Sequence, residues 1–342
     1  MKVDLAGFSR NLTSSFEAAS ESQGLFAFER IHMAGRSLRL NFLTEAMRDA
    51  LMPSLMHLRS ESMSNPTDDL ILNIWESGVD GFFPPPWPFD NSEPRSDLIW
   101  PFDGSFAAAL SHESGAFSFF DAKISTGIFW IRDARHLRGY EKAAPLLHLL
   151  HWYFMNIGLH ITHAAVVGNA TSAALLTGKG GSGKSTSAAL ALNGGLLHLA
   201  DDYCLLSVDT PRAHAFYRSI KLHPRSLGLP PLISWRDSSS WSSEEKEVLL
   251  VDRDIPDETP LRLIIMPKVV GNGATRSFPA TSAEALRSLA PSSLFQLRGN
   301  EAGNFSFYAM LAKTLPSYHL ELGADPENVA PCIRDLLEKH AL

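Results

Sequence analysis

The stretch Gly178-Lys-Gly-Gly-Ser-Gly-Lys-Ser185 decides the fold of this 342-residue chain. It matches the pattern G-x-x-x-x-G-K-[ST], in which a glycine-rich loop directs its backbone N–H groups at phosphate groups. The apolar run Ala173 to Thr177 before it predicts a strand, and the alanine- and leucine-rich run Lys184 to Leu192 after it predicts a helix. Strand, loop and helix in this order predict an α/β core built around a phosphate-binding loop.

The residue types of this loop each answer a need of phosphate binding. Glycine at positions 178, 180, 181 and 183 allows left-handed backbone and close approach of the ligand. The helix that follows points its N-terminal N–H groups at negative charge. Lys184 supplies a cation for the β- and γ-phosphates, and the Ser185 hydroxyl can coordinate Mg²⁺. The expected nucleotide contacts are Gly178, Lys179, Gly180, Gly181, Ser182, Gly183, Lys184, Ser185 and Thr186.

Two adjacent carboxylates follow the next predicted strand, Leu196 to Ala200. Asp201 and Asp202 thus stand at the carboxyl end of a strand, where α/β sheets bind their ligands. Neighbouring residues of a strand face opposite ways, so one carboxylate can reach Mg²⁺ while the other takes a proton. The alternative is a polar strand end that caps the next segment.

His163 lies 21 residues before Lys184, within the predicted strand Ile161 to Val167. The hairpin partner of that strand leads into the phosphate loop, so the ring could approach the carboxylates. Taken alone, a single histidine on an apolar strand is more typical of a core residue whose polar atoms are satisfied.

The composition limits the classes of protein that fit. A net charge of -7 gives no electrostatic argument for a nucleic-acid partner. Two cysteines are too few for a disulfide scaffold of this length. The most apolar stretch, Pro145 to Val167, contains four histidines and a glycine and is a poor membrane span. We expect a soluble cytoplasmic protein without nucleic-acid or membrane partners.

The first part of the chain predicts a β-rich α+β domain over residues 1–140. Its strand-like segments are 69–75, 105–110, 116–120 and 126–132. Leu38 to Leu58 has helix-compatible apolar spacing that Pro53 interrupts. A helix from Glu141 to Asn156 is expected to open a second domain, 141–342, which contains the nucleotide site. The sequence leaves the role of the first domain open, with acceptor binding as the candidate.

Two other groups of residues give weaker indications of function. His148, His151, His160 and His198 lack the cysteine pair or HExxH pattern of a zinc site. The serine-rich run Trp235 to Lys246 predicts a loop, either a plain surface loop or one that lies over the active site.

His163, Gly178–Ser185 and Asp201-Asp202, in this order and spacing, resemble the HPr kinase/phosphorylase family. That family is similar to phosphoenolpyruvate carboxykinase in its nucleotide-binding fold. The resemblance is good over residues 161–204. A subgroup that includes the lasso-peptide tailoring kinases resembles this chain at Ala144–Trp152, Thr162–Gly168 and Ala200–Cys204. The resemblance implies an α/β fold, with a phosphate-loop kinase core of HPr kinase/phosphoenolpyruvate carboxykinase type and an N-terminal β-rich α+β domain.

The resemblance also implies roles for the site residues. Lys184 and the loop amides would hold the β- and γ-phosphates of ATP, and Ser185 and Asp202 would hold Mg²⁺. Asp201 would be the general base, and His163 would orient it. The residues themselves leave open whether the two aspartates exchange these roles. A homo-oligomer is also implied.

One departure from the family concerns the metal. HPr kinases carry an acidic residue in a Glu-Ile-Arg-Gly segment, whereas the nearest counterpart here, Ala215 to Lys221, has none. Arg218 or Lys221 could contact phosphate instead, or be an ordinary solvated charge. The segment used for phosphorolysis has no good match, which weakens any expectation of a reverse reaction.

These observations favour a kinase that uses ATP and Mg²⁺ and phosphorylates a serine-type hydroxyl of a peptide or small protein, including a ribosomally made lasso-type precursor. The alternatives are a small-molecule kinase on the same scaffold and a nucleotide-binding regulator without transfer activity.

Overall fold

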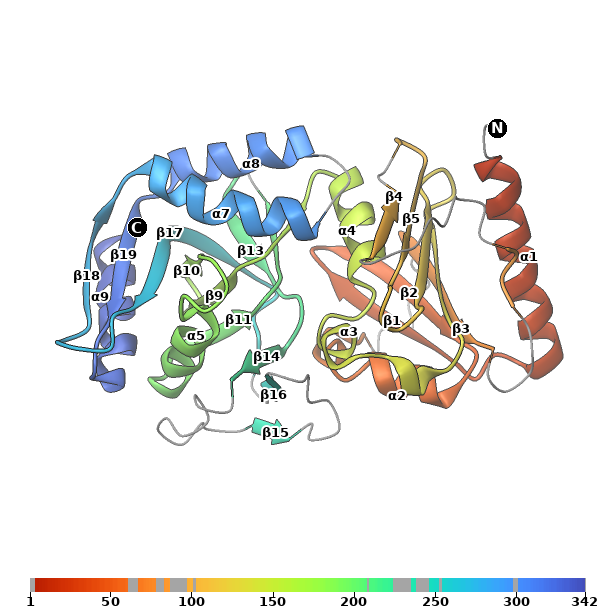
Figure 1. Ribbon diagram of the computed structural model, residues 1–342, viewed down its shortest axis with the longest axis horizontal. Helices are drawn as coiled ribbons and strands as arrows, with labels where there is room; N and C mark the ends of the chain where they lie inside the picture. The colour runs from red at the N-terminus through yellow and green to blue at the C-terminus, as the bar shows by residue number, and fades with distance from the viewer. Residues whose placement is uncertain are drawn as a thin grey trace. The chain divides into compact units, whose positions relative to one another are not determined.

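The computed structural model describes residues 4–60, 67–77, 83–86, 97–100, 103–207, 209–223, 235–237, 246–251, 254–297 and 301–341. The chain folds into two compact units, Met1–Ile157 and Gly158–Leu342. Both units combine helices with a sheet, so the protein is a mixed α and β structure (Figure 1). None of the helices in the described ranges is long and apolar enough to cross a membrane.

The first unit is built on a seven-stranded sheet with the order β1-β2-β3-β7-β6-β5-β4 among its described residues. The strands β2, β3 and β7 run parallel to one another, and the other neighbours are antiparallel. Their bounds are β1 Ala27–Met33, β2 Arg36–Phe42, β3 Leu70–Glu76, β4 Leu98–Trp100, β5 Phe106–Leu110, β6 Phe117–Asp121 and β7 Thr126–Ile131. The strands predicted from residue 69 to residue 132 are therefore present.

Helices cover both faces of this sheet (Figure 1). Helix α1, Leu5–Gln23, packs Leu12 and Phe16 into an aromatic core that includes Trp75 and Phe119. On the other face, α4 packs against β6, and its Leu149 lies beside Gly127 of β7. Helix α4 spans Leu147–Asn156, and the remaining helices of this unit are α2 Glu45–Leu51 and α3 Gly139–Ala143. Short 3₁₀ turns lie at Met56–Leu58 and Ala134–His136.

Two helix predictions for this half of the chain are wrong. The segment 38–58 is not one interrupted helix: Leu38, Leu40 and Phe42 alternate with more exposed residues in β2, and α2 begins only after its cap, Thr44. The segment 141–156 forms two helices, which separate at residues 144–146. Because α4 packs on the first sheet, this segment belongs to the first unit, and the boundary lies after Ile157 rather than before residue 141.

The second unit holds a nine-stranded sheet among its described residues. Its main order is β11-β9-β10-β17-β13-β12-β8, while β19 pairs with the second half of β17, and β18 pairs with β19. Their bounds are β8 His160–Thr162, β9 Ala165–Gly168, β10 Ala173–Leu176, β11 Leu197–Ala200, β12 Cys204–Ser207, β13 Arg212–His214, β17 Glu258–Val269, β18 Arg276–Ala280 and β19 Ser317–Leu322. A separate small sheet has the order β14-β16-β15, from Ser219–Leu222, Glu247–Val251 and Trp235–Asp237.

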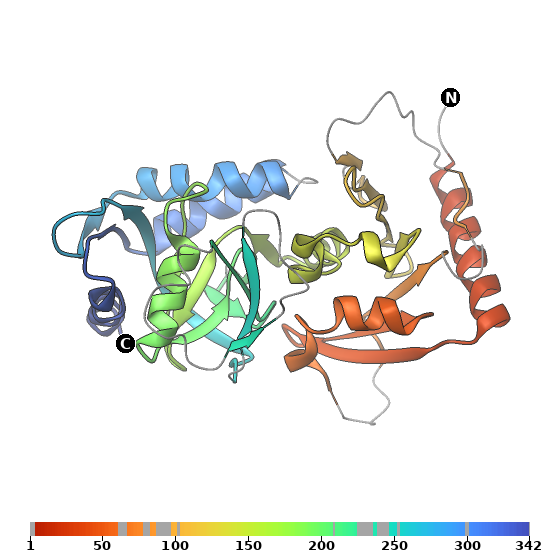
Figure 2. The ribbon, with the colours of Figure 1, turned by 60° about the horizontal axis from the view of Figure 1, so that its bottom comes forward.

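Helices lie on both faces of the large sheet (Figures 1 and 2). Helices α5, Lys184–Asn193, and α9, Val329–Lys339, share one apolar core with the sheet. Helices α7, Ser282–Gln296, and α8, Glu301–Thr314, pack on the opposite face. Both faces of the sheet are thus covered, which explains the continuous apolar runs of β9 and β10.

Two predictions in this unit need correction. The strand predicted over 161–167 is divided into β8 and β9 by His163 and Ala164, because β8 pairs with β12 whereas β9 pairs with β10 and β11. Strands β13 and β14 are separate in the same way, since β13 belongs to the large sheet and β14 to the small one. Trp235–Asp237 forms β15 rather than loop, and residues 238–245 lie outside the described ranges.

Candidate functional site

The phosphate loop connects β10 to α5, so the strand and the helix predicted around it are present. Strands β10 and β17 are parallel, and so are β17 and β19. Strand β11 has the same direction as β10, because each is antiparallel to β9. The carboxyl ends of these four strands therefore lie at one edge of the sheet, together with the loop and the aspartates that follow β11.

The loop glycines differ in what they permit. Gly178, Gly181 and Gly183 have positive φ angles of 153°, 76° and 103°, as predicted. Gly180 does not have a positive φ, so the prediction of a left-handed conformation there is wrong. A Cβ at Gly183 would lie 2.6 Å from Leu322 Cδ1, whereas one at Gly180 would have open space. Both the backbone conformation and the packing at position 183 therefore require glycine.

Lys184 is buried and lies inside its own loop. Its Nζ donates hydrogen bonds to the carbonyl oxygens of Gly178, at 2.6 Å, and Lys179, at 3.3 Å. Burial lowers the pKa of the Lys184 ammonium, and the negative charges of Asp201 and Asp202 oppose that shift. Helix α5 begins at Lys184 without a side-chain cap, so the positive end of its dipole and its first backbone N–H groups face the loop. The loop therefore combines a cation with backbone donors.

Asp201 is almost fully buried at 1% exposure. Its Oδ2 accepts a hydrogen bond from the backbone N–H of Lys221 at 3.1 Å, and the Ser185 hydroxyl also interacts with this carboxylate. Its Oδ1 has no hydrogen-bond partner among the described residues. Burial and the neighbouring negative charge of Asp202 raise the pKa of the Asp201 carboxyl. Asp201 thus faces the loop serine with one oxygen unused.

Asp202 has different partners. Its Oδ1 lies 3.2 Å from His163 Nε2, and its Oδ2 forms a short ion pair with Lys221 Nζ. Burial would raise the pKa of this carboxyl, but the Lys221 ammonium and the His163 ring hold it below its ordinary value. Asp202 is therefore a carboxylate at neutral pH. Its side chain is 19% exposed, so it is more accessible than Asp201.

His163 follows β8 and is held from two sides. Its backbone N–H donates to Ser293 Oγ of α7 at 3.0 Å, and its ring lies against the ring of Tyr203. Its Nδ1 has no hydrogen-bond partner within the described ranges, so an Nε2–H tautomer is the one that donates to Asp202. The ring therefore lies beside Asp202, rather than beside Asp201 as the family resemblance implies.

Lys221 is the site residue that the sequence points to least clearly. It extends from β14 and contacts both carboxylates, Asp201 through its backbone and Asp202 through its side chain. The available signal was its alternation with Ile220 and Leu222, which are both buried and leave the lysine on the other face of the strand. The four histidines considered for zinc are split between the two units, on α4, β8 and β11.

The residues near the loop fit a hard divalent cation such as Mg²⁺. The unpaired Oδ1 of Asp201 is a buried oxygen donor, and the Ser185 hydroxyl interacts with the same carboxylate. Carboxylate and hydroxyl oxygens are the ligands that Mg²⁺ prefers.

The comparisons with known proteins add little to this geometry. No family model matches the sequence, and no curated protein matches it. Among solved structures, this chain is similar to the HPr(Ser) kinase/phosphatase from Coxiella burnetii, with 12% sequence identity and a TM-score of 0.27. The match covers 53% of this chain and 95% of the Coxiella burnetii chain. It is a member of the family that the sequence motifs resemble, but a likeness at this TM-score carries no argument about fold or activity. The chemistry must be inferred from the site itself.

Proposed function

We propose that this chain is a kinase that uses ATP and Mg²⁺ and transfers the γ-phosphate to a serine-type hydroxyl of a peptide or small protein. The observation that carries the proposal is the position of two carboxylates beside a phosphate loop. Asp201 interacts with Ser185 of that loop, and Asp202 lies in an ion-paired cluster next to it. A binding loop alone indicates only a nucleotide, whereas a second group that can accept a proton indicates transfer.

The loop residues would bind the nucleotide. When phosphate arrives, the Lys184 ammonium would exchange the carbonyl oxygens of Gly178 and Lys179 for β- and γ-phosphate oxygens. The backbone N–H groups at the start of α5 would add further donors. Mg²⁺, when bound, neutralises charge on the phosphates and orients them. Phosphoryl transfer needs little else from a protein beyond positioning and charge stabilisation.

The contacts favour a definite division of work between the aspartates. Asp201 interacts with the loop serine, and its Oδ1 has no hydrogen-bond partner among the residues that the structure describes. It is too buried to meet an acceptor, so we assign it with Ser185 to Mg²⁺. Asp202 is more accessible and is oriented by His163, so we assign it to the acceptor hydroxyl. This assignment is the exchange of roles that the sequence left open. Lys221 holds both carboxylates in place.

In the transfer step, the acceptor oxygen forms a bond to the γ-phosphorus, and the bond from that phosphorus to the β,γ-bridging oxygen breaks. The hydroxyl proton passes to the Asp202 carboxylate, and ADP leaves with the bridging oxygen. Asp202 has a low pKa and is a weak base, which suits a reaction whose transition state is loose and needs the proton removed late.

The acceptor is the finer part of the proposal. We propose a peptide or small protein, bound with help from the first unit, and a ribosomally made lasso-type precursor peptide is the first acceptor to test. The sequence resemblance is its support. The same resemblance implies a homo-oligomer, and the low cysteine content favours a cytoplasmic setting.

The test is transfer of label from γ-labelled ATP with Mg²⁺ to serine-containing peptides, with a metabolite extract and an assay of ATP binding in parallel. Lys184→Ala should reduce transfer to background, and Lys313→Ala, which removes an exposed lysine of α8, should not. Label on a metabolite would instead identify a small-molecule kinase. ATP binding without any transfer would identify a regulator, and unchanged turnover in Lys184→Ala would remove the phosphate-loop assignment.

A further inference from the structure

A second candidate site lies away from the phosphate loop, at the start of β17. A cavity of about 550 Å³ opens there between the turn before β13, the first residues of β17 and the connection from α8 to β19. Small-molecule sites commonly have volumes of this order. Arg262 is separated from Val269, which packs near Gly183, by seven residues of strand, or roughly 23 Å at the usual rise per residue.

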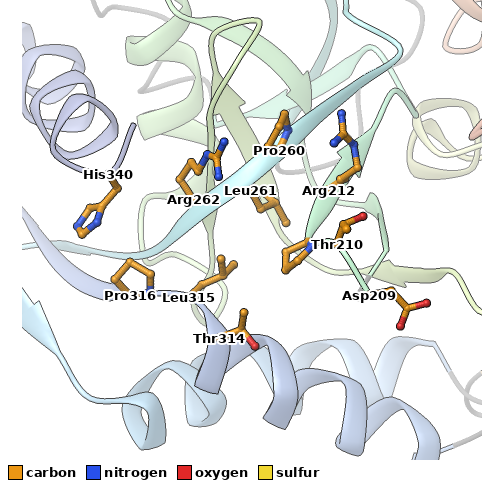
Figure 3. Close-up of a pocket in the computed structure, with 11 residues that line it drawn as sticks. Asp209, Thr210, Arg212, Pro260, Leu261, Arg262, Thr314, Leu315, Pro316 and His340 are labelled. Atoms are coloured by element: carbon orange, nitrogen blue, oxygen red, sulfur yellow. The ribbon is translucent and has the colours of Figure 1, made fainter. Parts of the chain in front are cut away.

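Two arginines face this cavity from neighbouring strands (Figure 3). Arg212 of β13 lies opposite Pro260 of β17, and Figure 3 shows Arg212 and Arg262 among the residues that line the same cavity. Arg212 already has an acidic partner, since its Nη2 lies 2.8 Å from Glu258 Oε1. Arg262 forms no ion pair with any residue in the described ranges, although the exposed Asp209 also lines the cavity. Arg262 is therefore a cation without an anion among those residues.

The backbone of β17 is irregular at Arg262. Leu261 lies opposite Ala173 of β10, and Leu263 lies opposite the next residue, Ala174, so Arg262 is the extra residue of a β-bulge. Bulges redirect a side chain and are frequent beside functional sites. The Nε of Arg262 is buried and has no hydrogen-bond partner among the described residues. A guanidinium donor of this kind, beside a cavity, can bind an anion there.

The rest of the lining favours a ligand with an apolar body. Pro260, Leu261, Leu315 and Pro316 contribute carbon surface to the cavity. The walls are also fixed by the backbone, because Leu261 N–H donates to the carbonyl of Pro211 at 2.8 Å. A planar guanidinium fork beside such a surface suits a carboxylate or a phosphate attached to an apolar group.

We propose that this cavity binds a small organic anion, a carboxylate or phosphate ester with an apolar body, and that Arg262 is its anchor. The proposal does not depend on the kinase activity, because the cavity shares none of its lining residues with the phosphate loop. Three probes separate the sources of the anionic group: 4-fluorobenzoate, 4-fluorophenyl phosphate and inorganic phosphate. The first two have the same apolar body, and the third has none.

Binding is measured by ¹⁹F NMR for the fluorinated probes and by calorimetry for inorganic phosphate. Every measurement is made on the wild-type chain and on Lys184→Ala, which disables the phosphate loop. We expect saturable binding of at least one fluorinated probe in both proteins, tighter than that of inorganic phosphate. Arg262→Gln should weaken it about tenfold or more, the usual effect of losing a hydrogen bond to a charged group. Arg262→Lys should fall between the two.

Thr314→Trp is the second variant, because it fills the cavity from the exposed end of α8 and leaves both arginines in place. It should abolish binding while the melting temperature stays near that of the wild type. It also keeps the proposal testable if Arg262→Gln does not fold. Binding that is equal in the wild type, Arg262→Gln and Thr314→Trp would overturn the proposal. So would a wild-type chain that binds neither fluorinated probe at about 10 mM, the range of the weakest specific affinities.

Discussion

Replacing Asp202 by asparagine separates chemistry from structure, because the amide keeps the shape of the carboxylate but not its charge. In the wild type, Asp202 lies 3.2 Å from His163 Nε2 and pairs with Lys221 Nζ. The amide oxygen of the substituted side chain could still accept from the histidine ring, whereas Lys221 would lose its anion. We expect the free energy of unfolding to fall by about 1–3 kcal/mol, the usual effect of removing one partner of a largely buried charged contact.

The rate of phosphoryl transfer should fall much further. Removing a positioned proton acceptor lowers a rate by roughly 10²–10⁴. ATP should still bind within a few-fold, because the phosphate loop and Lys184 are unchanged. Asp201→Asn is the matched control, with the same chemical change one residue away. It removes a hard oxygen ligand, so its transfer rate should recover when the Mg²⁺ concentration is raised.

The assay combines thermal unfolding, ATP binding and single-turnover transfer to the acceptor over a range of Mg²⁺ concentrations. The opposite pattern, with Asp202→Asn rescued by Mg²⁺ and Asp201→Asn slow at every concentration, would show that the aspartates have the roles implied by the family resemblance. A normal rate per folded molecule in Asp202→Asn at every Mg²⁺ concentration would refute its catalytic assignment.

Three further outcomes follow from particular contacts. Gly183→Ala should abolish ATP binding through the clash and the strained φ, while Gly180→Ala should bind normally; equal affinities measured by calorimetry would contradict this. Lys221→Met should slow transfer more than it weakens ATP binding, and Lys221→Arg should restore part of the rate; a loss confined to ATP affinity would mean that this lysine serves the nucleotide alone. Hydrogen bonds from Thr275 lower the pKa of Asp325 to about 2. The Asp325 carboxylate therefore contributes stability above the ordinary aspartate pKa of about 3.9, and this contribution disappears as the pH falls through about 2. Asp325→Asn should be less stable than the wild type at neutral pH, and the gap should close in acid melts.

The core of the second unit is predictable from sequence because its signals are local. A glycine-rich loop, an apolar strand before it and a helix after it occupy adjacent residues, and β10 and α5 begin within a residue of their predicted starts. The strands from residue 69 to residue 132 are equally visible, since turn residues separate short β-branched and aromatic runs.

The errors concern pairings between distant residues. The run 161–167 is apolar except at Thr162 and His163, so it shows no periodicity that could reveal a break. Its two halves nevertheless pair with different strands. The division depends on β12 and β10, which pair with β8 and β9 respectively. The contact of Lys221 with Asp202 is similarly non-local, and so is the bulge at Arg262. The helix prediction for Leu38 to Phe42 was wrong for a different reason. A short amphipathic run fits both the helical period of about 3.6 residues and the strand period of 2 until its strand partners are known.

The turn at Asp202 explains how neighbouring carboxylates can serve one site. In a regular strand, adjacent side chains point to opposite faces, so Asp201 and Asp202 would be separated by the sheet. Asp202 has a φ of 67°, in the left-handed region, and the N–H of Tyr203 donates to the Asp201 carbonyl at 2.8 Å. This conformation costs of order 1 kcal/mol for a residue other than glycine. It ends the alternation, and both carboxylates then meet Lys221. Local strain of this kind persists where surrounding contacts fix it, and here the His163 and Lys221 contacts do so. In the mechanism that we propose, this turn would let one carboxylate serve the phosphate loop and the other serve the acceptor.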